Sequence, residues 1–416
     1  MRAVLVWSIA GGAIAGVLFR PRGWPEAVWA CLGAMLFLVF GLIPFGSALV
    51  AVGKGIDVYL FLTGMMLLAE LARREGVFDW LASLAVSAAK SSRTRLFALV
   101  YLVGTVVTIF LSNDATAVVL TPAVYAAVKK ARVEPLPYLF ICAFIANAAS
   151  FVLPISNPAN LVVYGKNLPP LWAWLRVFLL PSAGSIIATY LVLRWSVRKE
   201  LTGQVEDSSD GVTLSKEGRR AFWGILFTGA ILIAASAFGI DLGLPTCIAA
   251  LLSVLVVTRG SRSAMTEIGK GVSWSVLPLV AGLFVLVEAV NRVGALSDMS
   301  HFLQTCSQMP GLQGSLAVSF GIAALSNLVN NLPSGLLAGG AVPAAHVPAL
   351  IRDSVLIGVD LGPNLSVTGS LATVLWLIAL RREGEHVTGW HFLKMGALIM
   401  PPALLLAIGA VWLVSH

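Results

Sequence analysis

Polar side chains interrupt an apolar stretch of the chain at residues 111–116, which read Leu-Ser-Asn-Asp-Ala-Thr. Ser112, Asn113 and the ionisable Asp114 lie here inside a run that is otherwise apolar from residue 96 to residue 128. Such side chains are costly in hydrocarbon and are usually functional where they occur in it. The three residues are therefore candidates for solute binding and for proton transfer.

Three more polar breaks follow the same pattern. Residues 154–160 (Pro-Ile-Ser-Asn-Pro-Ala-Asn) interrupt the next apolar stretch, and residues 326–333 and 360–370 interrupt two stretches of the second half. At a helix break, Ser, Thr and Asn side chains can satisfy backbone groups that lost their helical partners and can also bind a small hydroxylated solute. The residues that we expect to bind the solute are Ser112, Asn113, Ser156, Asn157, Asn330, Asn331, Thr368 and Ser370. The alternative is that the asparagines at the tips only cap the broken helices.

Two carboxyl groups at these breaks are candidates for ion coupling. Asp114 is the one acidic residue at a predicted hairpin tip. The positive end of the following half-helix favours its ionised form, whereas burial favours the neutral acid, so the group can take up and release a proton. Asp360, beside Gly362 and Pro363, is in a similar position. We expect proton coupling at Asp114, with Asp360 as the alternate. A static helix-capping role is the alternative for both.

Two other acids close long apolar helices near the expected membrane surfaces. Glu70 lies close to Arg73 and Arg74, and Glu288 lies close to Arg292. We expect these acids to form structural ion pairs, which is the usual role of such surface pairs.

The composition indicates a membrane protein. Of the 416 residues, 58% are hydrophobic and 12% are charged, and the mean hydropathy is +0.89, so a soluble globule would lack polar surface. The first apolar run, residues 4–19, ends before Arg20 and is followed by more runs, so we expect a retained helix rather than a cleaved signal peptide. The net charge of +8 comes from basic residues at the ends of apolar runs, which favours membrane orientation over binding of nucleic acid.

Motifs typical of soluble enzymes and of metal sites are absent from the sequence. There is no Walker loop, no GxSxG motif and no pair of histidines at metal-ligand spacing. No CxxC motif occurs among the scattered cysteines, which are Cys31, Cys142, Cys247 and Cys306. We therefore expect neither an enzyme nor a bound metal or cofactor, and we expect the cysteines to serve packing.

Basic residues place both ends of the segment 96–128 on one side of the membrane. The segment is preceded by Lys90, Arg93 and Arg95 and followed by Lys129, Lys130 and Arg132. Because cytoplasmic loops are enriched in Lys and Arg, we expect a re-entrant hairpin that enters from the cytoplasm and turns near the midplane at Asn113 and Asp114. Non-helical backbone at that depth is tolerated only where it lines a cavity or is buried in protein. The segment 314–342 has no basic residue close by, which indicates a hairpin that enters from outside.

The whole pattern predicts an all-α polytopic membrane protein with two inverted-topology repeats, each with a re-entrant hairpin and a discontinuous transmembrane helix. The first repeat is residues 1–197, with its hairpin at about 96–128 and its broken helix at about 136–166. A cytoplasmic linker follows at residues 198–220. The second repeat is residues 221–416, with its hairpin at about 314–342 and its broken helix at about 348–380. Both termini are expected on the outer side of the membrane.

Four segments carry a resemblance to a known family. They read LSNDATAVVLTPA at residues 111–123, PISNPANLVV at 154–163, LSNLVNNLPSG at 325–335 and DLGPNLSVTGSLATVLWL at 360–377. In these segments, and over essentially its whole length, the chain resembles the membrane subunit of the bacterial arsenite efflux pump, the arsenical pump family within the ion transporter superfamily. The last segment is the most specific, because the SND and SNP motifs also occur in related sodium/proton antiporters and dicarboxylate transporters.

The resemblance implies secondary active export of trivalent arsenic and antimony hydroxides from the cytoplasm in exchange for protons, across the cell inner membrane. For some systems it also implies a soluble ATPase partner. Sodium/proton antiport and transport of silicic acid or a carboxylate are the alternatives, and a homo-oligomer is a further open question. Only Cys142 lies near a break, about three helical turns before Pro154. We therefore expect oxygen and amide groups to bind the neutral hydroxide without thiolate ligands.

Overall fold

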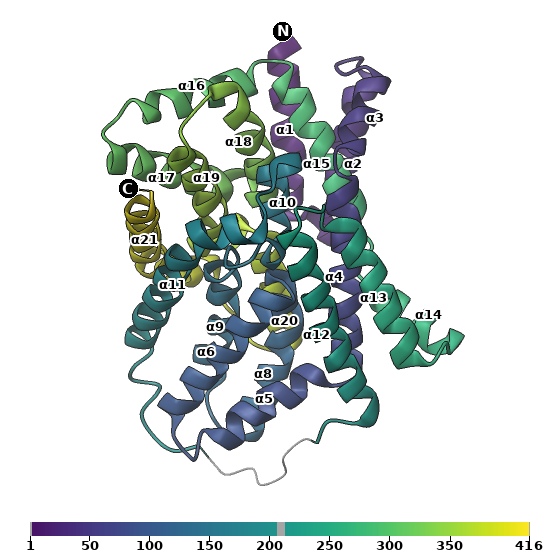
Figure 1. Ribbon diagram of the computed structural model, residues 1–416, viewed down its shortest axis with the longest axis vertical. Helices are drawn as coiled ribbons and strands as arrows, with labels where there is room; N and C mark the ends of the chain where they lie inside the picture. Colours follow the sequence, from purple (N-terminus) through teal and green to yellow (C-terminus); the bar gives the residue numbers. More distant parts are fainter. Residues whose placement is uncertain (1, 206–212, 416) are drawn as a thin grey trace.

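The computed structural model describes residues 2–205 and 213–415, so residues 206–212 of the predicted linker lie outside the described part. Within that part the chain is almost entirely helical and has no β-strand, although Ser92 and Gln204 form an isolated bridge (Figure 1). Six helices are long and apolar enough to cross a membrane, or up to eight if each of two bent pairs is one span. The chain is a multi-pass membrane protein.

The first half of the chain starts with long apolar helices and ends with a hairpin, a broken helix and another long helix. Its α-helices are α1 (Arg2–Phe19), α2 (Glu26–Val39), α3 (Phe45–Gly53), α4 (Ile56–Arg74), α5 (Val77–Ala88), α6 (Arg93–Phe110), α7 (Asn113–Ala115), α8 (Thr121–Lys130), α9 (Leu136–Ala148), α10 (Pro158–Tyr164) and α11 (Leu171–Ser196). Between them lie the shorter elements η1 (Pro21–Gly23), η2 (Thr116–Leu120), η3 (Pro154–Ser156) and η4 (Gly165–Asn167).

The second half repeats this order. Its α-helices are α12 (Lys216–Ala237), α13 (Gly243–Thr258), α14 (Arg262–Gly271), α15 (Val276–Asn291), α16 (Ala295–Ser307), α17 (Gly311–Val329), α18 (Asn331–Ala345), α19 (Ala349–Leu361), α20 (Leu371–Arg382) and α21 (Gly389–Val414), with the short elements η5 (Gly362–Asn364) and η6 (Val367–Gly369). Each half also contains a pair of helices with a bend between them. The bend between α3 and α4 is 48°, and the bend between α14 and α15 is 42°. The last helices, α11 and α21, are both 26 residues long and contain internal prolines.

The two hairpins enter from opposite ends of the molecule. In Figure 1, α5 and α8 lie toward the lower end, whereas α16 and α18 lie toward the upper end. A non-helical turn at Leu111 and Ser112 separates α6 from α7, and Asn330 separates α17 from α18. This inverted arrangement confirms the predicted fold class. The limits of the two repeats and of the linker stay a prediction.

Each broken helix is interrupted by proline and by short polar residues. Pro154 lies in the break between α9 and α10, Pro158 begins α10, and Pro363 lies in the break between α19 and α20. Proline has no backbone N–H and cannot donate to the preceding turn, so these residues keep the helices apart at the breaks. Exposed backbone groups at the ends are then capped locally, for example by Ser370, whose Oγ accepts from Thr373 N at 3.1 Å.

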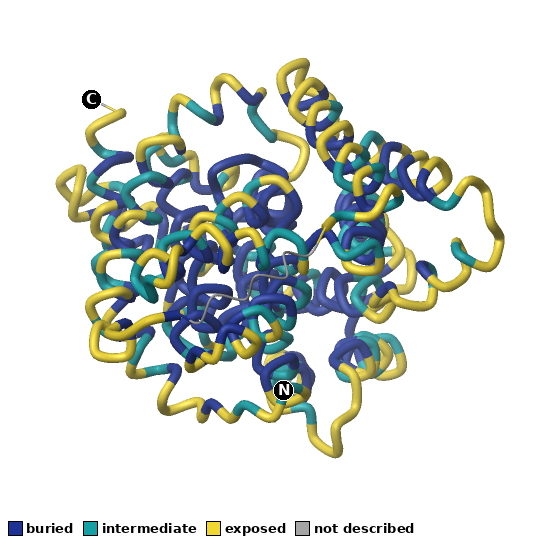
Figure 2. Tube along the Cα trace, turned by 90° about the horizontal axis from the view of Figure 1, so that it is seen from below, coloured by how far each residue is buried: buried dark blue, intermediate teal, exposed yellow. Residues whose placement is uncertain are grey.

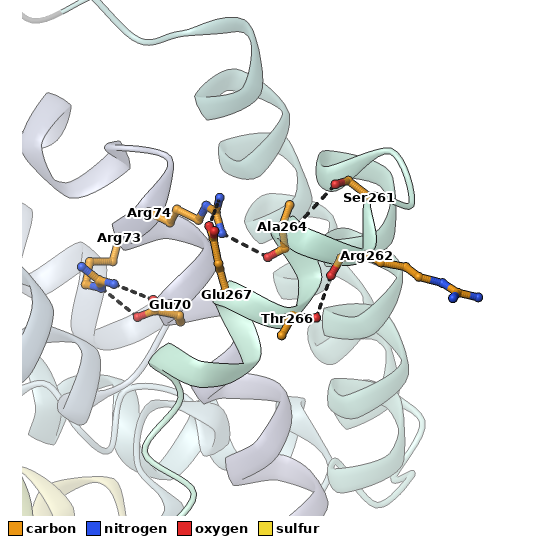
Figure 3. A network of polar contacts seen from close by, with 8 residues as sticks. All are labelled: Glu70, Arg73, Arg74, Ser261, Arg262, Ala264, Thr266 and Glu267. Atoms are coloured by element: carbon orange, nitrogen blue, oxygen red, sulfur yellow. Dashed lines mark hydrogen bonds and ion pairs between the residues drawn. The ribbon is translucent and has the colours of Figure 1, made fainter.

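Ionic contacts involve basic residues at one end of the molecule, where α4 ends and α12 begins. Arg74 at the end of α4 pairs with Glu267 on α14 at 2.5 Å (Figure 3). Arg259, after α13, lies 3.8 Å from Glu217 at the start of α12. Near the end of α8, Lys129 lies 4.0 Å from Glu385.

The opposite end, where α3 and α15 end, also carries basic residues. Lys54 lies 3.5 Å from Glu288, and Arg292 lies 3.3 Å from the same carboxylate and donates to Ser47 Oγ at 2.7 Å. The predicted ion pair of Glu288 with Arg292 is therefore confirmed. These two groups of charged residues lie at opposite ends of the molecule, and which end faces the cytoplasm stays a prediction.

Close helix packing builds the interior. Helix α4 packs along α13, α2 along α15, and α11 along α21. A Cβ atom at Gly64 would lie 2.7 Å from the Thr246 backbone, so only glycine allows α4 to approach α13 this closely. Figure 2 shows buried residues concentrated in the centre and exposed residues around the rim. Exposed apolar side chains, such as Leu191, Leu251 and Leu405, are positioned to face lipid.

Candidate functional site

The tip of the first hairpin is held by its own side chains. Ser112 Oγ accepts a hydrogen bond from Ala115 N at 3.2 Å and caps α7. Asn113 is buried, and its Oδ1 accepts from Asp114 N at 2.9 Å. Across the hairpin, the hydroxyl groups of Thr108 and Thr116 lie 2.8 Å apart. Ser112 therefore caps this tip, and Asn113 adds one further hydrogen bond to its backbone.

Asp114 differs from its neighbours because its carboxylate has no recorded partner within the described chain. Its backbone N–H is capped by Asn113, but neither carboxylate oxygen forms a recorded hydrogen bond or ion pair. The side chain is half-buried and lines a cavity of about 790 Å³. We call this space the open cavity. An unpaired carboxylate on its wall is available to a solute or a proton.

The open cavity runs from charged residues at one end of the molecule to the first hairpin and the first broken helix. At the inner end it is lined by Ser112, Asp114, Pro158 and Leu371. Toward the mouth it is lined by charged side chains, which are Glu70, Arg73, Asp79, Arg382 and Glu383. A water molecule occupies about 30 Å³ of liquid, so the space admits a hydrated small solute.

A polar network fixes the mouth of this cavity (Figure 3). Arg73 donates two hydrogen bonds to the Glu70 carboxylate, at 2.7 Å and 2.5 Å. This bidentate contact confirms the predicted ion pair of Glu70 with Arg73. Arg74 donates to the Ala264 carbonyl at 3.1 Å as well as pairing with Glu267, so α14 is fastened to the end of α4.

The first broken helix forms hydrogen bonds with the first hairpin and with the second half of the chain. Ser156 Oγ donates to the Ile109 carbonyl at 2.9 Å, which ties the break to α6. Asn157 caps α10, because its Oδ1 accepts from Ala159 N at 3.0 Å. Its Nδ2 donates to Asp360 Oδ1 at 2.9 Å, across the boundary between the two halves. Ser156 and Asn157 therefore position helices and do not line the open cavity.

Asp360 is not exposed to the open cavity. Its side chain has 0% exposure, and it contacts Ser150 at 2.7 Å in addition to Asn157. The structure thus brings the two sequence-predicted carboxyl groups into different surroundings. Asp114 lines a cavity and lacks a partner, whereas Asp360 is enclosed between the two broken helices.

The tip of the second hairpin is linked to the second broken helix. Asn330 has φ 77° and ψ 154°, a strained backbone conformation that is adopted almost only by glycine. Its Oδ1 accepts from Leu332 N at 3.4 Å, and its Nδ2 donates to the Thr368 carbonyl at 3.4 Å. Asn331 is buried beside it. A cavity of only about 10 Å³ lies next to Asn330 and Leu371.

Three asparagines that we did not predict from the sequence, Asn147, Asn327 and Asn364, form hydrogen bonds at these breaks. Asn327 accepts from Ser366 Oγ at 2.5 Å and donates to the Gly362 carbonyl at 2.8 Å. Asn147 donates to Asn364 Oδ1 at 2.9 Å, which connects α9 with η5. Each is an amide inside an apolar helix or a break, so the cost argument that singled out Asp114 also applied to them. Their partners, however, come from distant parts of the chain.

The two ends of the molecule differ in how tightly the hairpins close. A Cβ atom at Gly339 on α18 would lie 2.4 Å from the Val163 carbonyl on α10, so these helices are in close backbone contact. Beside them, Tyr164 donates to Asp353 at 2.9 Å, and Arg352 donates to the same carboxylate at 2.8 Å. The corresponding helices of the inverted arrangement, α8 and α20, both line the open cavity. The structure is open at one end and closed at the other.

A helical membrane fold with two re-entrant hairpins and two broken helices around a cavity defines a membrane transporter. The chain belongs to the CitMHS family, whose sequence model is described as "Citrate transporter" and matches residues 13–358.

Curated relatives extend this likeness over nearly the whole chain. The chain is 26% identical over 419 residues to the arsenical pump membrane protein of Escherichia coli, and the alignment covers 95% of each chain. It is also 26% identical over 377 residues to an uncharacterized transporter of Mycobacterium tuberculosis, covering 86% of each. The resemblance to the arsenical pump family is confirmed.

Two solved structures share the fold. The YdaH transporter of Alcanivorax borkumensis aligns with a TM-score of 0.55 and 16% identity, covering 89% of this chain and 87% of that one. MtrF of Neisseria gonorrhoeae, described as illuminating a class of antimetabolite efflux pumps, aligns with a TM-score of 0.51 and 13% identity, covering 85% and 80%. At this level of identity the likeness concerns the fold alone.

Proposed function

We propose that the protein exports trivalent metalloid hydroxides, arsenous and antimonous acid, from the cytoplasm in exchange for protons. The observation that carries the proposal is the charge of the open cavity, which four carboxylate side chains and only two arginines line. One of these arginines, Arg73, is already paired with Glu70. A neutral hydroxide meets no charge barrier in such a space, and the similarity to arsenical pump membrane proteins supports the same substrate class.

Citrate, which the family name mentions, is less compatible with these walls. Citrate carries several negative charges, and placing like charges together costs several kcal/mol. The inner end of the open cavity offers Ser112 and Asp114 but neither lysine nor arginine among its described lining. Arg382, the second arginine of the lining, is exposed near the mouth. An anionic substrate would therefore need a differently charged cavity.

The proposed solute ligands are six of the eight hydroxyl and amide side chains that the sequence singled out, because Ser156 and Asn157 are already bonded to Ile109 and Asp360. Ser112 belongs to the wall of the open cavity, and Asn113 lies beside it on the same tip. Asn330, Asn331, Thr368 and Ser370 surround the closed tip and would reach the solute when the second hairpin opens. Among the described residues, none of the four cysteines lines the open cavity, which supports binding through oxygen and amide groups.

Coupling to protons follows from the neutrality of the substrate. The membrane potential cannot drive a neutral solute, so an ion has to be exchanged. We propose Asp114 as the carrier, because its carboxylate is unpaired on the cavity wall, whereas Asp360, the alternate that the sequence indicated, is enclosed and bonded to Ser150 and Asn157. If solute binding requires the ionised acid, solute and proton compete, and each weakens the binding of the other by the same factor.

Sodium/proton antiport is the second candidate function, because an unpaired carboxylate in an acidic cavity also suits a cation. The test is metalloid uptake into everted membrane vesicles under an imposed pH gradient, with and without sodium, in a host that lacks an arsenical pump ATPase. We expect uptake of arsenite and antimonite that is independent of sodium and unaffected by excess citrate or silicic acid. Sodium-driven proton movement without metalloid uptake would establish antiport instead. Uptake only after addition of an ATPase subunit would show that the chain is not a transporter on its own.

A further inference from the structure

Two short contacts meet at a single hydroxyl group between the two broken helices. Ser150 Oγ lies 2.7 Å from Asp360 Oδ2 and also 2.7 Å from the backbone oxygen of Asn147. The other carboxyl oxygen of Asp360 accepts from Asn157 Nδ2 at 2.9 Å. All four side chains are at most 1% exposed, so no solvent completes the network.

The number of protons in this network decides the state of the carboxyl group. A serine hydroxyl has one proton to donate, and a backbone carbonyl can only accept. An ionised Asp360 could also only accept, so one of the two contacts at Ser150 would hold two oxygens at hydrogen-bond distance without a proton between them. A proton on Asp360 Oδ2 removes this conflict. Asp360 then donates to Ser150, and Ser150 donates to the Asn147 carbonyl.

The charges around Asp360 favour the same assignment. Helices α9, α10, α17 and α18, which pack against or beside this position, contain no lysine, arginine or histidine. Their titratable side chains are Tyr138, Cys142 and Tyr164. Asp360 also lies in the last turn of α19, where the carbonyl end of the helix carries partial negative charge. An ionised carboxylate would be buried here without a counter-charge, which is strongly unfavourable.

The charged groups on the remaining neighbouring elements are directed elsewhere. On α19 itself, Arg352 is paired with Asp353. On α21, His391 and Lys394 are exposed, and Lys394 lies over the Trp390 ring. On α16, Asp298 and His301 are exposed as well.

The network is also short of hydrogen-bond donors. Asn147 Oδ1 and Asn160 Oδ1 are buried without a recorded partner in the described structure. Asn160 uses its amide nitrogen on the carbonyls of Ser150, at 2.9 Å, and of Leu153, at 3.3 Å. One more acceptor with a full negative charge would deepen this shortage, whereas a protonated carboxyl adds a donor.

We propose that Asp360 is held as a neutral carboxylic acid, whose resident proton joins the second broken helix to the first. In this role Asp360 is a positioning residue that acts through Ser150 and Asn157, and it does not exchange its proton during transport. The inference rests on hydrogen-bond geometry and is independent of the substrate. Only the corollary, that Asp114 alone carries the transported proton, rests on the proposed function.

Infrared spectroscopy of the purified full-length protein tests the protonation directly. We expect a C=O stretching band of a protonated carboxylic acid that persists from about pH 6 to pH 9, a range in which ordinary carboxyl groups are ionised. The band should be absent from D360N and present in D114N. A wild-type band that is lost within this range, or a spectrum that D360N leaves unchanged, would overturn the proposal. Isotope labelling of the aspartate carboxyl groups in the wild type gives the same readout if D360N does not fold.

Transport by two variants separates a resident proton from an exchanging one. In D360N the amide can donate to Ser150 Oγ and accept from Asn157, so we expect transport within about threefold of the wild type. In D360A both hydrogen bonds are lost, and we expect at least a tenfold loss, which corresponds to about 1.4 kcal/mol. If D360N reaches the membrane in normal amounts but loses proton-driven transport, Asp360 is an exchanging carrier and the proposal is wrong. Failure of metalloid transport in the wild type would contradict the proposed function, yet it would leave the infrared result decisive for Asp360.

Discussion

Asp114 and Asp360 are both carboxyl groups within apolar helices, but their surroundings differ. Asp114 lies on the wall of the open cavity, and no hydrogen bond or ion pair of its carboxylate is recorded in the described chain. Asp360 is enclosed and bonded to Ser150 and Asn157. A carboxyl group that faces a hydrated cavity can exchange protons with it, whereas an enclosed one depends on its neighbours.

Replacing Asp114 tests its role as the carrier. Asp114→Asn removes the exchangeable proton but keeps the shape of the side chain, so we expect metalloid binding to persist while pH-driven accumulation in everted vesicles is lost. Asp79→Asn is the matched control, because Asp79 lines the same cavity but is exposed near its mouth. Accumulation by the Asp114 variant at the rate of the control would exclude Asp114 as the carrier.

The tip asparagines have their own test. Asn113 and Asn331 are buried at the starts of α7 and α18, where they can satisfy backbone groups and bind solute. We expect Asn113→Ala and Asn331→Ala each to abolish metalloid resistance, while loss of a cap alone would cost only about 1 kcal/mol. The exposed Asn167→Ala serves as a control. Resistance at the wild-type level, with equal amounts of protein in the membrane, would show that these asparagines only cap helices.

The cysteines provide a third test at the residue scale. They are dispersed over the fold, and none lines the open cavity within the described chain. A protein with all four replaced by Ala or Ser should keep most of its arsenite transport in vesicles. Loss of transport that is traced to Cys142 alone, with normal expression, would instead indicate a thiolate ligand.

Sequence reasoning found the polar residues in apolar helices but not their partners. Asp360 and Asn157 are separated by 203 positions in the chain, and nothing in their local sequences indicates that they meet. The same holds for Asn147 and Asn364, which are 217 positions apart. Burial cost identifies an unusual side chain, but which residue compensates for it depends on the packing of whole helices.

At the scale of elements, the state of each end depends on two helices, one from a hairpin and one from a broken helix. The end is closed where the two helices pack together and open where the cavity separates them. Helix α18 of the second half lies against α10 of the first half, with Gly339 next to the Val163 carbonyl. Helices α8 and α20 form the reverse combination and line the open cavity. If α8 and α20 packed together while α18 and α10 separated, the cavity would open at the other end of the molecule.

Two adjacent glycines give a matched pair of variants for this contact. A Cβ atom at Gly339 would lie 2.4 Å from backbone, whereas one at Gly340 would meet only the Leu296 side chain at 3.5 Å. We expect Gly339→Ala to separate α18 from α10 at a cost of about 1–3 kcal/mol, and Gly340→Ala to have little effect. The measurement is labelling of a cysteine introduced at Val163 by a membrane-impermeant thiol reagent. Equal labelling in the two variants would show that this contact does not keep the end closed.

The hairpins and breaks could be predicted because their signals are local. Basic residues on both sides of residues 96–128 indicated a re-entrant segment, and proline marked the broken helices. The π-helical turn at Thr116–Leu120 was not predicted, since no simple sequence signal distinguishes it from α-helix. Which hairpin contacts which broken helix also had to come from the structure.

At the scale of the whole molecule, the charges divide into two ends, and their assignment to the two sides of the membrane can be tested. Arg93 donates to the Thr202 carbonyl at 3.2 Å, which places the chain after α11 at the end that we expect in the cytoplasm. A fluorescent protein inserted after Gly203 should therefore fluoresce. A C-terminal alkaline phosphatase fusion should be active, because that enzyme folds only outside the cytoplasm. The reverse pair of results would show that the molecule is inserted the other way.

The hydrogen bonds between Asp360, Ser150 and Asn157 have a consequence for inheritance. The carboxyl group belongs to the second half of the gene and its partners to the first. A substitution at Asp360 that loses these hydrogen bonds, such as Asp360→Ala, leaves buried polar groups in the other half unsatisfied, so it would persist only beside a compensating change there. Among related genes, position 360 should therefore vary together with positions 150 and 157. Chimeric proteins that combine halves of two distant homologues should lose transport unless the residues at positions 150, 157 and 360 come from the same homologue.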